Sequence, residues 1–207
     1  MDKQSNKRIE QIARFVEKRL KDKARDEADA HNRWQHTLRV TNYGKVLAEA
    51  EGANVEVVVA ACLLHELAVF DDIPEQEIGR KAAELARPFL QKQDFDARTQ
   101  DAICYAVACH VDVPNPDTLE AKVVTDADNI DRFGAYRAIQ YVAQDANKYT
   151  DLITSLLDRI HILRKVRGRD VMETTTGNQM FNEQVEQQLE MYDALLKEND
   201  WTVLPKI

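Results

Sequence analysis

The sequence has little glycine, proline or cysteine. Six glycines and five prolines in 207 residues leave few positions for the tight turns of a many-stranded sheet, so helices joined by short loops are favoured. The three cysteines are odd in number and lie within apolar runs, which indicates small buried hydrophobes in a reducing compartment rather than a disulfide framework. These scarcities predict an all-α protein.

We expect neither a signal peptide nor a membrane span. Charged residues recur throughout residues 1–20, so this segment has no apolar signal-peptide core. No run approaches the roughly 20 apolar residues that cross a bilayer. Positive charge is in deficit, since the formal net charge is −8 and the pI is near 5.2, which argues against a nucleic-acid polymer as partner. We therefore expect a cytoplasmic protein with no membrane or nucleic-acid partner.

The length favours one domain. A chain of 207 residues can bury one substantial core, since domains commonly have about 100–200 residues. Hydrophobic residues make up 44% and charged residues 31%, which is typical of a globular protein. We predict a single domain over residues 1–207.

Apolar periodicity predicts helices along the chain. The predicted helices span residues 7–21, 32–50, 74–92, 96–110, 118–131, 137–144, 152–166 and 181–197. Residues 57–64 are eight consecutive apolar residues, and their three adjacent valines leave a strand as the alternative. We favour a buried helix, because Asn54 can cap it and the following Ala-Ala-Cys-Leu-Leu has helical propensity.

Three histidines lie on buried helix faces. His36, His65 and His110 are each four residues from an apolar residue of their own helix, which places each on the apolar face near a helix end. A single histidine of this kind is more often a core residue satisfied by a hydrogen bond. Three of them favour a shared site.

Carboxylates join the histidines in this pattern. Glu66 follows a buried helix with no lysine or arginine within four positions, so its charge needs a partner from elsewhere in the fold, and a metal ion is the simplest. Asp128 faces inward by its spacing, whereas for Asp126 and Asp131 we favour a solvated acidic face or a helix cap. The predicted ligands of one divalent cation are His36, His65, Glu66 and Asp128. Such a nitrogen and oxygen set suits Mn²⁺, Fe²⁺, Co²⁺, Zn²⁺ or Mg²⁺.

His36, the doublet His65-Glu66 and Asp128 resemble the H…HD…D signature of the HD superfamily of metal-dependent phosphohydrolases. The segments HNRWQHTLRV, AACLLHELA, AVACHVDVP and TLEAKVVTDADNIDRFGA, and a TTTG before the last helix, resemble the small bacterial single-domain HD proteins in order and rough spacing. The resemblance covers a core of about residues 25–195. It implies an HD-domain helical bundle with one metal in its middle, and hydrolysis of a phosphate ester of a nucleotide or a similar small phosphorylated metabolite.

The doublet departs from the family at one residue. Glu66 stands where the family has Asp and is longer by one methylene, about 1.5 Å, whereas ligand distances of about 2.0–2.2 Å tolerate little error. Two functions therefore stay open. One is a metal-dependent phosphohydrolase, and the other is a catalytically degenerate HD domain that binds a metal or a nucleotide as a sensor or interaction module. A purely structural helical protein is the weakest alternative.

Further charged residues are candidates for chemistry at a catalytic site. The cation would activate water and polarise a phosphoryl oxygen, and the general acid would be His110 or His31. His31 lies five positions before His36 and would reach the site from the start of the helix. The candidates to bind the substrate phosphate are Arg39, Lys122 and Arg132. The sequence leaves a homodimer open.

Overall fold

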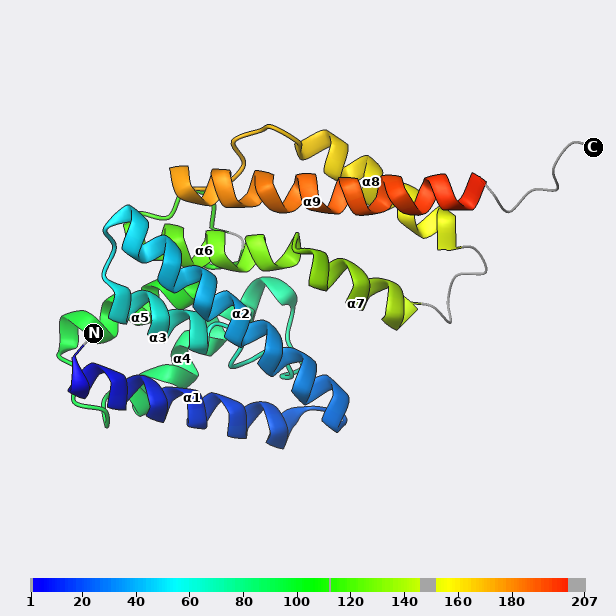
Figure 1. The fold of residues 1–207 in the computed structure, drawn as a ribbon. Coiled ribbons are helices and arrows are strands. Elements are labelled where there is room, and N and C mark those ends of the chain that lie inside the picture. Colours follow the sequence, from blue (N-terminus) through cyan, green and yellow to red (C-terminus); the bar gives the residue numbers. More distant parts are fainter. Residues whose placement is uncertain (1, 112, 146–151, 201–207) are drawn as a thin grey trace, which may run out of the picture. The chain divides into compact units, whose positions relative to one another are not determined.

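The structure, a computed structural model, describes residues 2–111, 113–145 and 152–200. Within these ranges the chain forms helices and no strand (Figure 1), which confirms the predicted all-α class. The α-helices are α1 (Lys3–Lys23), α2 (Glu27–Glu51), α3 (Val55–Leu64), α4 (Ile78–Leu90), α5 (Ala97–Cys109), α6 (Leu119–Arg132), α7 (Ala135–Asp145), α8 (Leu152–Val166) and α9 (Thr175–Asn199). A short 3₁₀ helix, η1 (Glu75–Glu77), precedes α4.

The helices fall into two compact units. Unit 1 comprises Met1–Asp131 together with Glu173–Gly177, and unit 2 comprises Arg132–Met172 and Asn178–Ile207. The single domain over residues 1–207 stays a prediction, and the two units are described separately.

Helix α3 is the hydrophobic centre of unit 1. All eight residues from Val57 to Leu64 are buried, and α3 packs against α1, α2 and α5. The Asn54 side chain accepts hydrogen bonds from the backbone N–H groups of Glu56 and Val57, which satisfies two donors that a helix start leaves unpaired. The predicted buried helix is confirmed here, and the strand alternative is wrong.

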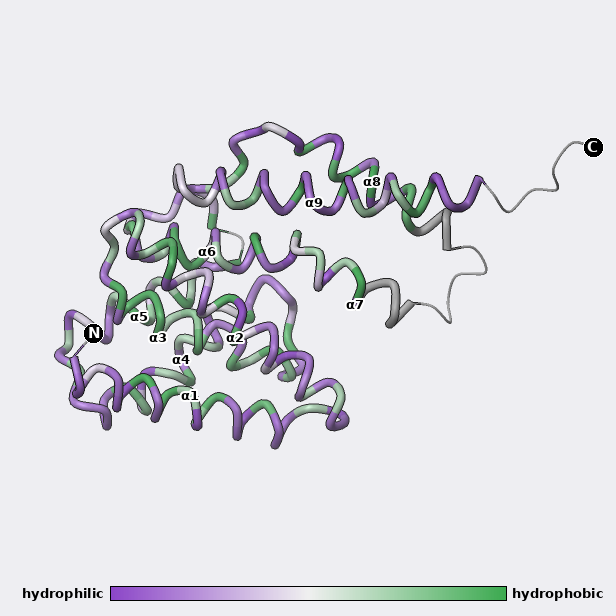
Figure 2. Tube along the Cα trace, viewed as in Figure 1, coloured by the Kyte–Doolittle hydropathy of each residue, from purple (hydrophilic) through white to green (hydrophobic). Residues whose placement is uncertain are grey.

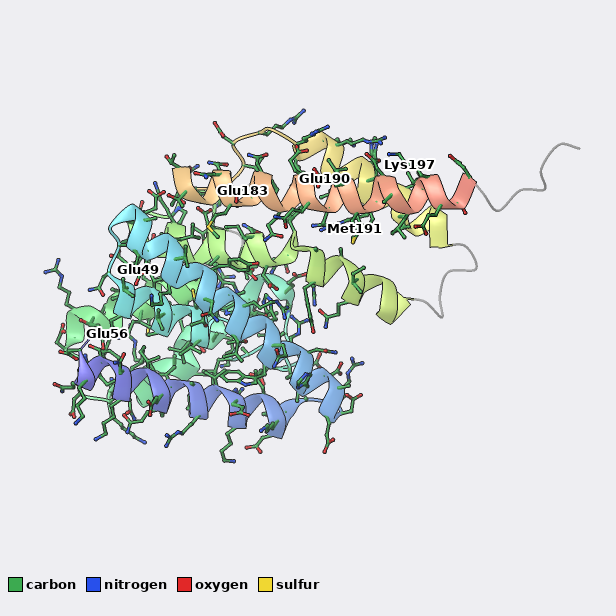
Figure 3. The ribbon with its side chains drawn as sticks, viewed as in Figure 1. Glu49, Glu56, Glu183, Glu190, Met191 and Lys197 are labelled. Carbon is green, nitrogen blue, oxygen red and sulfur yellow. The ribbon has the colours of Figure 1, made fainter. Side chains whose placement is uncertain are left out.

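Helix α1 covers α3 with one apolar face. Ile12, Val16 and Leu20 recur at helical spacing and are fully buried, and Figure 2 shows hydrophobic and hydrophilic residues alternating along α1. Arg8 donates from Nε to Glu56, which Figure 3 labels, at 2.9 Å. This half-buried ion pair fixes α1 against the first turn of α3.

Several helix boundaries differ from the prediction. Helix α2 begins at Glu27 rather than near residue 32, because the Asp26 side chain caps it by accepting from Asp29 N–H at 2.8 Å. The predicted helix over 74–92 is divided into η1 and α4. Helix α9 begins at Thr175 rather than near residue 181. These boundaries were missed because polar first turns lack the apolar periodicity that marks a helix interior.

The TTTG segment is held against α6 within unit 1. The Asp126 carboxylate accepts from Glu173 N–H at 2.7 Å and from the N–H and hydroxyl of Thr174 at 2.9 and 2.6 Å. A Cβ on Gly177 would lie 2.3 Å from Asp126 Oδ2, so only glycine fits. Asp126 is fully buried. The solvated-face interpretation is therefore wrong for Asp126, which acts like a cap on the backbone before α9.

Unit 2 has its own small core. Phe133 and Phe181 pack edge to face with ring centroids 4.9 Å apart, and the Arg159 guanidinium lies 4.7 Å from the Phe133 centroid. Ile160 and Leu163 of α8 are buried.

In the described part of the chain no helix combines the length and apolar character of a membrane span.

Candidate metal centre

Unit 1 brings three of the four predicted metal ligands into one buried cluster. His36 on α2 and His65 and Glu66 directly after α3 each offer a ligand atom, and these atoms lie within 4.8 Å of one another. Asp128 on α6 places Oδ1 3.3 Å from His36 Nε2 and 3.9 Å from His65 Nε2. All four residues are at most 5% exposed, so the cluster is largely shielded from solvent.

Each of the three inward histidines has its Nδ1 bonded to a group that can only accept. His65 Nδ1 donates to the Cys62 carbonyl at 2.6 Å, and His110 Nδ1 donates to the Val107 carbonyl at 2.7 Å. Both rings stand one residue past a helix end and bond the carbonyl three residues earlier. His36 Nδ1 donates to Asp131 Oδ2 at 2.7 Å. Nδ1 therefore carries a proton in every ring, and Nε2 is the nitrogen that can bind a cation.

The Nε2 atoms of His36 and His65 face each other at 3.2 Å. Two neutral rings with protons on Nδ1 would place two lone pairs against each other, so this contact requires a proton or a metal cation. A cation at the usual nitrogen distance of about 2.0–2.1 Å from both atoms would make an N–metal–N angle of about 100°, close to tetrahedral. The donor set therefore fits a divalent metal ion.

Asp131 supports His36, and its role was missed from the sequence. It is 2% exposed and accepts from His36 and from the Nε and Nη2 of Arg39, at 2.5 and 3.1 Å. The solvated-face interpretation is wrong for this residue. A carboxylate that accepts from the Nδ1–H of a ligating histidine fixes its tautomer and ring orientation.

Arg33 is a second residue that sequence reasoning missed. Its Nη1 donates to Glu66 Oε2 at 2.9 Å, so the buried carboxylate has a basic partner 33 residues away in the chain. Burial raises the pKa of Glu66, but the charges of Arg33, His65 and His36 together outweigh it, so the pKa lies below its usual value. The burial of Glu66 therefore does not by itself require a metal ion, and the facing imidazoles carry that argument.

Local charges drive the pKa values of the two facing histidines apart. Burial lowers the pKa of His36, but hydrogen bonds to Asp128 and Asp131 outweigh it and raise the pKa to about 9. Burial, reinforced by His110, lowers the pKa of His65 to about 4. Near neutral pH a proton on His36 and a metal cation therefore compete for the same place between the rings.

His110 lies beside the cluster. It is 6% exposed, and its ring meets that of His65 edge to face with centroids 5.0 Å apart. Gly79 of α4 allows this packing, because a Cβ there would lie 2.8 and 2.9 Å from the Ala108 and Val107 carbonyls. His110 is thus the predicted general acid that the structure places next to the metal ligands.

The other predicted site residues lie elsewhere or are already engaged. His31 is exposed in the second turn of α2, not at its start, because the helix begins earlier than predicted. Arg39 is bound to Asp131. Lys122 is half-buried on α6, and Arg132 is exposed in unit 2, where its carbonyl accepts from Arg159 at 3.1 Å. Phosphate binding by Arg39, Lys122 and Arg132 stays a prediction.

Comparisons with known proteins identify an HD domain in the chain. Residues 33–132 match the family model of the HD domain, and this range contains all four predicted metal ligands. The uncharacterised protein YpgQ of Bacillus subtilis is 26% identical over 195 residues, which cover 86% of each chain.

Solved structures share the fold. An HD-superfamily hydrolase from Bacillus thuringiensis has a TM-score of 0.72 at 20% identity, over 95% of this chain and 98% of that one. Bacillus subtilis YpgQ in complex with ADP has a TM-score of 0.69 at 24% identity, over 94% and 96%. A predicted HD superfamily hydrolase from an uncultured Thermotogales bacterium has a TM-score of 0.66 at 19% identity, over 89% and 91%. The helical HD fold implied by the sequence motifs is confirmed.

Proposed function

Since residues 33–132 form an HD domain and the chain shares its fold with HD-superfamily hydrolases, we propose that it is a metal-dependent phosphohydrolase acting on a nucleotide or a similar small phosphorylated metabolite. The observation that carries the proposal is the facing pair of Nε2 atoms on His36 and His65 beside two buried carboxylates. Because each of these two rings has Nδ1 committed to an acceptor, the ring nitrogen left to bind a cation is Nε2.

The proposed metal ligands are His36, His65, Glu66 and Asp128. When bound, a divalent cation acts as a Lewis acid toward a phosphoryl oxygen and makes water more acidic. Asp131 keeps the proton of His36 on Nδ1, so Nε2 stays directed at the cation. The low exposure of the ligands excludes bulk water, which strengthens every electrostatic interaction in the cluster.

His110 is the proposed general acid. Its Nδ1 proton is bound to the Val107 carbonyl, so Nε2 is the atom that holds and delivers a proton to the leaving oxygen. Histidine is the side chain that most often serves as a general acid or base. The edge contact with His65 keeps the ring beside the metal ligands.

A nucleotide is the substrate class with some support from a relative. The crystal structure of Bacillus subtilis YpgQ contains ADP, and that protein covers most of this chain. We therefore propose nucleoside phosphates as the first compounds to test.

The test combines metal content with phosphate release. Protein purified without chelator is analysed for divalent metals, and wild type is compared with His65→Ala and with His161→Ala, which changes an exposed histidine of unit 2. We expect about one equivalent of metal in wild type and His161→Ala, none in His65→Ala, and phosphate release from nucleotides that follows the metal content. Phosphate release that persists at full rate in His65→Ala would contradict the proposal.

One observation favours a second function. Glu66 is longer than the family's Asp, and Arg33 holds it, which suits a degenerate HD domain that binds metal or nucleotide without turnover. The Glu66→Asp variant separates the two functions. If wild type shows no turnover and Glu66→Asp does, Glu66 has inactivated the site, which supports the binding module. Turnover in wild type supports the phosphohydrolase.

A further inference from the structure

Arg33 connects the buried cluster with solvent. Its side chain is 35% exposed, whereas that of Glu66, its ion-pair partner, is 6% exposed. Arg33 lies three residues before His36 on α2, so the two side chains share one face of the helix. The Arg33 side chain therefore contacts the buried cluster through Glu66 and is also partly open to solvent.

The two arginines of the cluster use their donors differently. Arg39 donates from both Nε and Nη2 to Asp131, so one edge of its guanidinium is taken by that carboxylate. Within the part of the chain that the structure describes, the Arg33 guanidinium makes one hydrogen bond, from Nη1 to Glu66. A guanidinium has five N–H donors in a planar fork that matches a phosphate group, and most of those of Arg33 remain for a ligand.

The charges of the cluster also favour an anion. The charged groups in the cluster and bonded to it are the carboxylates of Glu66, Asp128 and Asp131 and the guanidinium groups of Arg33 and Arg39. With neutral histidines, a divalent cation leaves this group with one positive charge in excess. Without Arg33 the excess would disappear. The arginine thus supplies the charge that an incoming phosphate would meet beside the metal.

We propose that Arg33 binds the phosphate group of the substrate, with Glu66 holding its guanidinium in place. The inference rests on the proposed function, because the phosphate is that of the substrate. The ion pair restricts the side chain before the ligand arrives, which lowers the entropy lost on binding. It also accounts for Glu66, whose carboxylate both belongs to the metal cluster and bonds Arg33.

The competing explanation is a structural ion pair that only neutralises buried Glu66. Arg8 and Glu56 provide the matched control, because they form another arginine–glutamate pair in unit 1, with side chains 16% and 19% exposed. Substituting either arginine removes the positive partner of a glutamate. Of Arg33 and Arg8, only Arg33 is bonded to a residue of the metal cluster, so only its loss should affect phosphate binding.

The experiment measures two affinities in wild type, Arg33→Gln, Arg33→Lys and Arg8→Gln. Mn²⁺ binding is measured first, and inorganic phosphate is then titrated calorimetrically into the Mn²⁺-loaded protein. We expect Arg33→Gln to keep its metal and to bind phosphate about 10- to 100-fold more weakly, as for the loss of a hydrogen bond between charged groups. Arg33→Lys keeps the positive charge but lacks the planar guanidinium, so its phosphate affinity should lie between those of wild type and Arg33→Gln. Arg8→Gln should bind phosphate as tightly as wild type.

Two results would overturn the assignment of Arg33 while the proposed function stands. One is wild-type phosphate affinity in metal-loaded Arg33→Gln, and the other is an equal loss in Arg8→Gln. A wild-type protein that binds neither Mn²⁺ nor any of Fe²⁺, Co²⁺, Zn²⁺ and Mg²⁺ would overturn the proposed function itself and the inference with it. The separate metal titration distinguishes these failures.

Discussion

The support that Asp131 gives His36 can be tested with Asp131→Asn. The carboxylate accepts three hydrogen bonds, one from His36 Nδ1 and two from Arg39. An asparagine has nearly the same shape, but one of its two terminal atoms is an NH₂ donor. That donor must face either the His36 Nδ1–H or the Arg39 guanidinium. The variant therefore disturbs the orientation or the tautomer of a proposed metal ligand without creating a cavity.

The expected loss follows from the position of Asp131 behind His36. Removing a partner of this kind weakens metal affinity by about 10- to 100-fold, which is about 1.4–2.7 kcal/mol at 25 °C. At an ion concentration of 100 times the wild-type Kd, the ion stabilises the wild-type fold by about 2.7 kcal/mol. At the same concentration it should stabilise Asp131→Asn by only about 0.4–1.4 kcal/mol.

Asp126→Asn is the matched control. Asp126 is also a buried carboxylate on α6 with three hydrogen bonds, but its donors are Glu173 and Thr174. Each substitution should cost about 1–3 kcal/mol of stability in metal-free protein, because a buried donor loses its acceptor. Urea unfolding with and without Mn²⁺ gives the stabilisation by the ion for each variant. Only Asp131→Asn should reduce it.

Two outcomes would refute the reasoning about Asp131. If Asp131→Asn bound Mn²⁺ as tightly as wild type, the Nδ1 contact would not orient His36 for an ion. If both variants lost the same metal affinity, the effect would come from general loosening of α6 and not from the histidine.

Three further measurements test the packing and the charges. Gly177→Ala should lower the free energy of unfolding by about 1–3 kcal/mol, because its Cβ would lie 2.3 Å from Asp126 Oδ2; urea unfolding at wild-type stability would contradict this contact. Asn54→Ala should cost about 1 kcal/mol in the same assay, because it removes the cap of α3, and Asn54→Asp should retain most of that stability. In chelator-treated protein the His36 pKa of about 9 exceeds the usual 6.5, so its contribution to stability is complete below pH 6.5 and is lost as the pH rises through 9. The difference between the free energies of unfolding at about pH 6 and about pH 9.5 measures this loss. The same difference in His36→Gln would exclude His36 as its source.

Most of the helical architecture could be predicted because the signal is local. The apolar run from Val57 to Leu64 and the N-cap Asn54 identify α3 without knowledge of its neighbours, and α1 shows its buried face in its periodicity. The starts of α2 and α9 were missed because their first turns are polar and depend on capping. The contacts at the start of α9 come from α6, nearly 50 residues earlier in the chain, and no local pattern contains them.

The cluster of proposed ligands could be predicted for the same reason, since helical spacing places His36 and Asp128 on inward faces. Their partners could not. Arg33 is 33 residues from Glu66, and Asp131 is 95 residues from His36, so each pairing depends on how the helices pack. Asp131 did carry one signal. It follows Asp128 by three residues, and positions three apart share a helix face, so a stricter use of the spacing would have placed it inward.

The histidines differ in how their orientation is fixed, and this difference bears on which part of the site is robust. His65 and His110 bond backbone carbonyls three residues earlier, so no single side-chain substitution removes those acceptors. His36 depends on the side chain of Asp131, which Arg39 holds in turn. The orientation of His36 is therefore open to change by substitution at two other positions, whereas that of the other two rings is set by the helix ends themselves. If the proposed cation binds between His36 and His65, its affinity should be tuned mainly from the α2 and α6 side of the cluster.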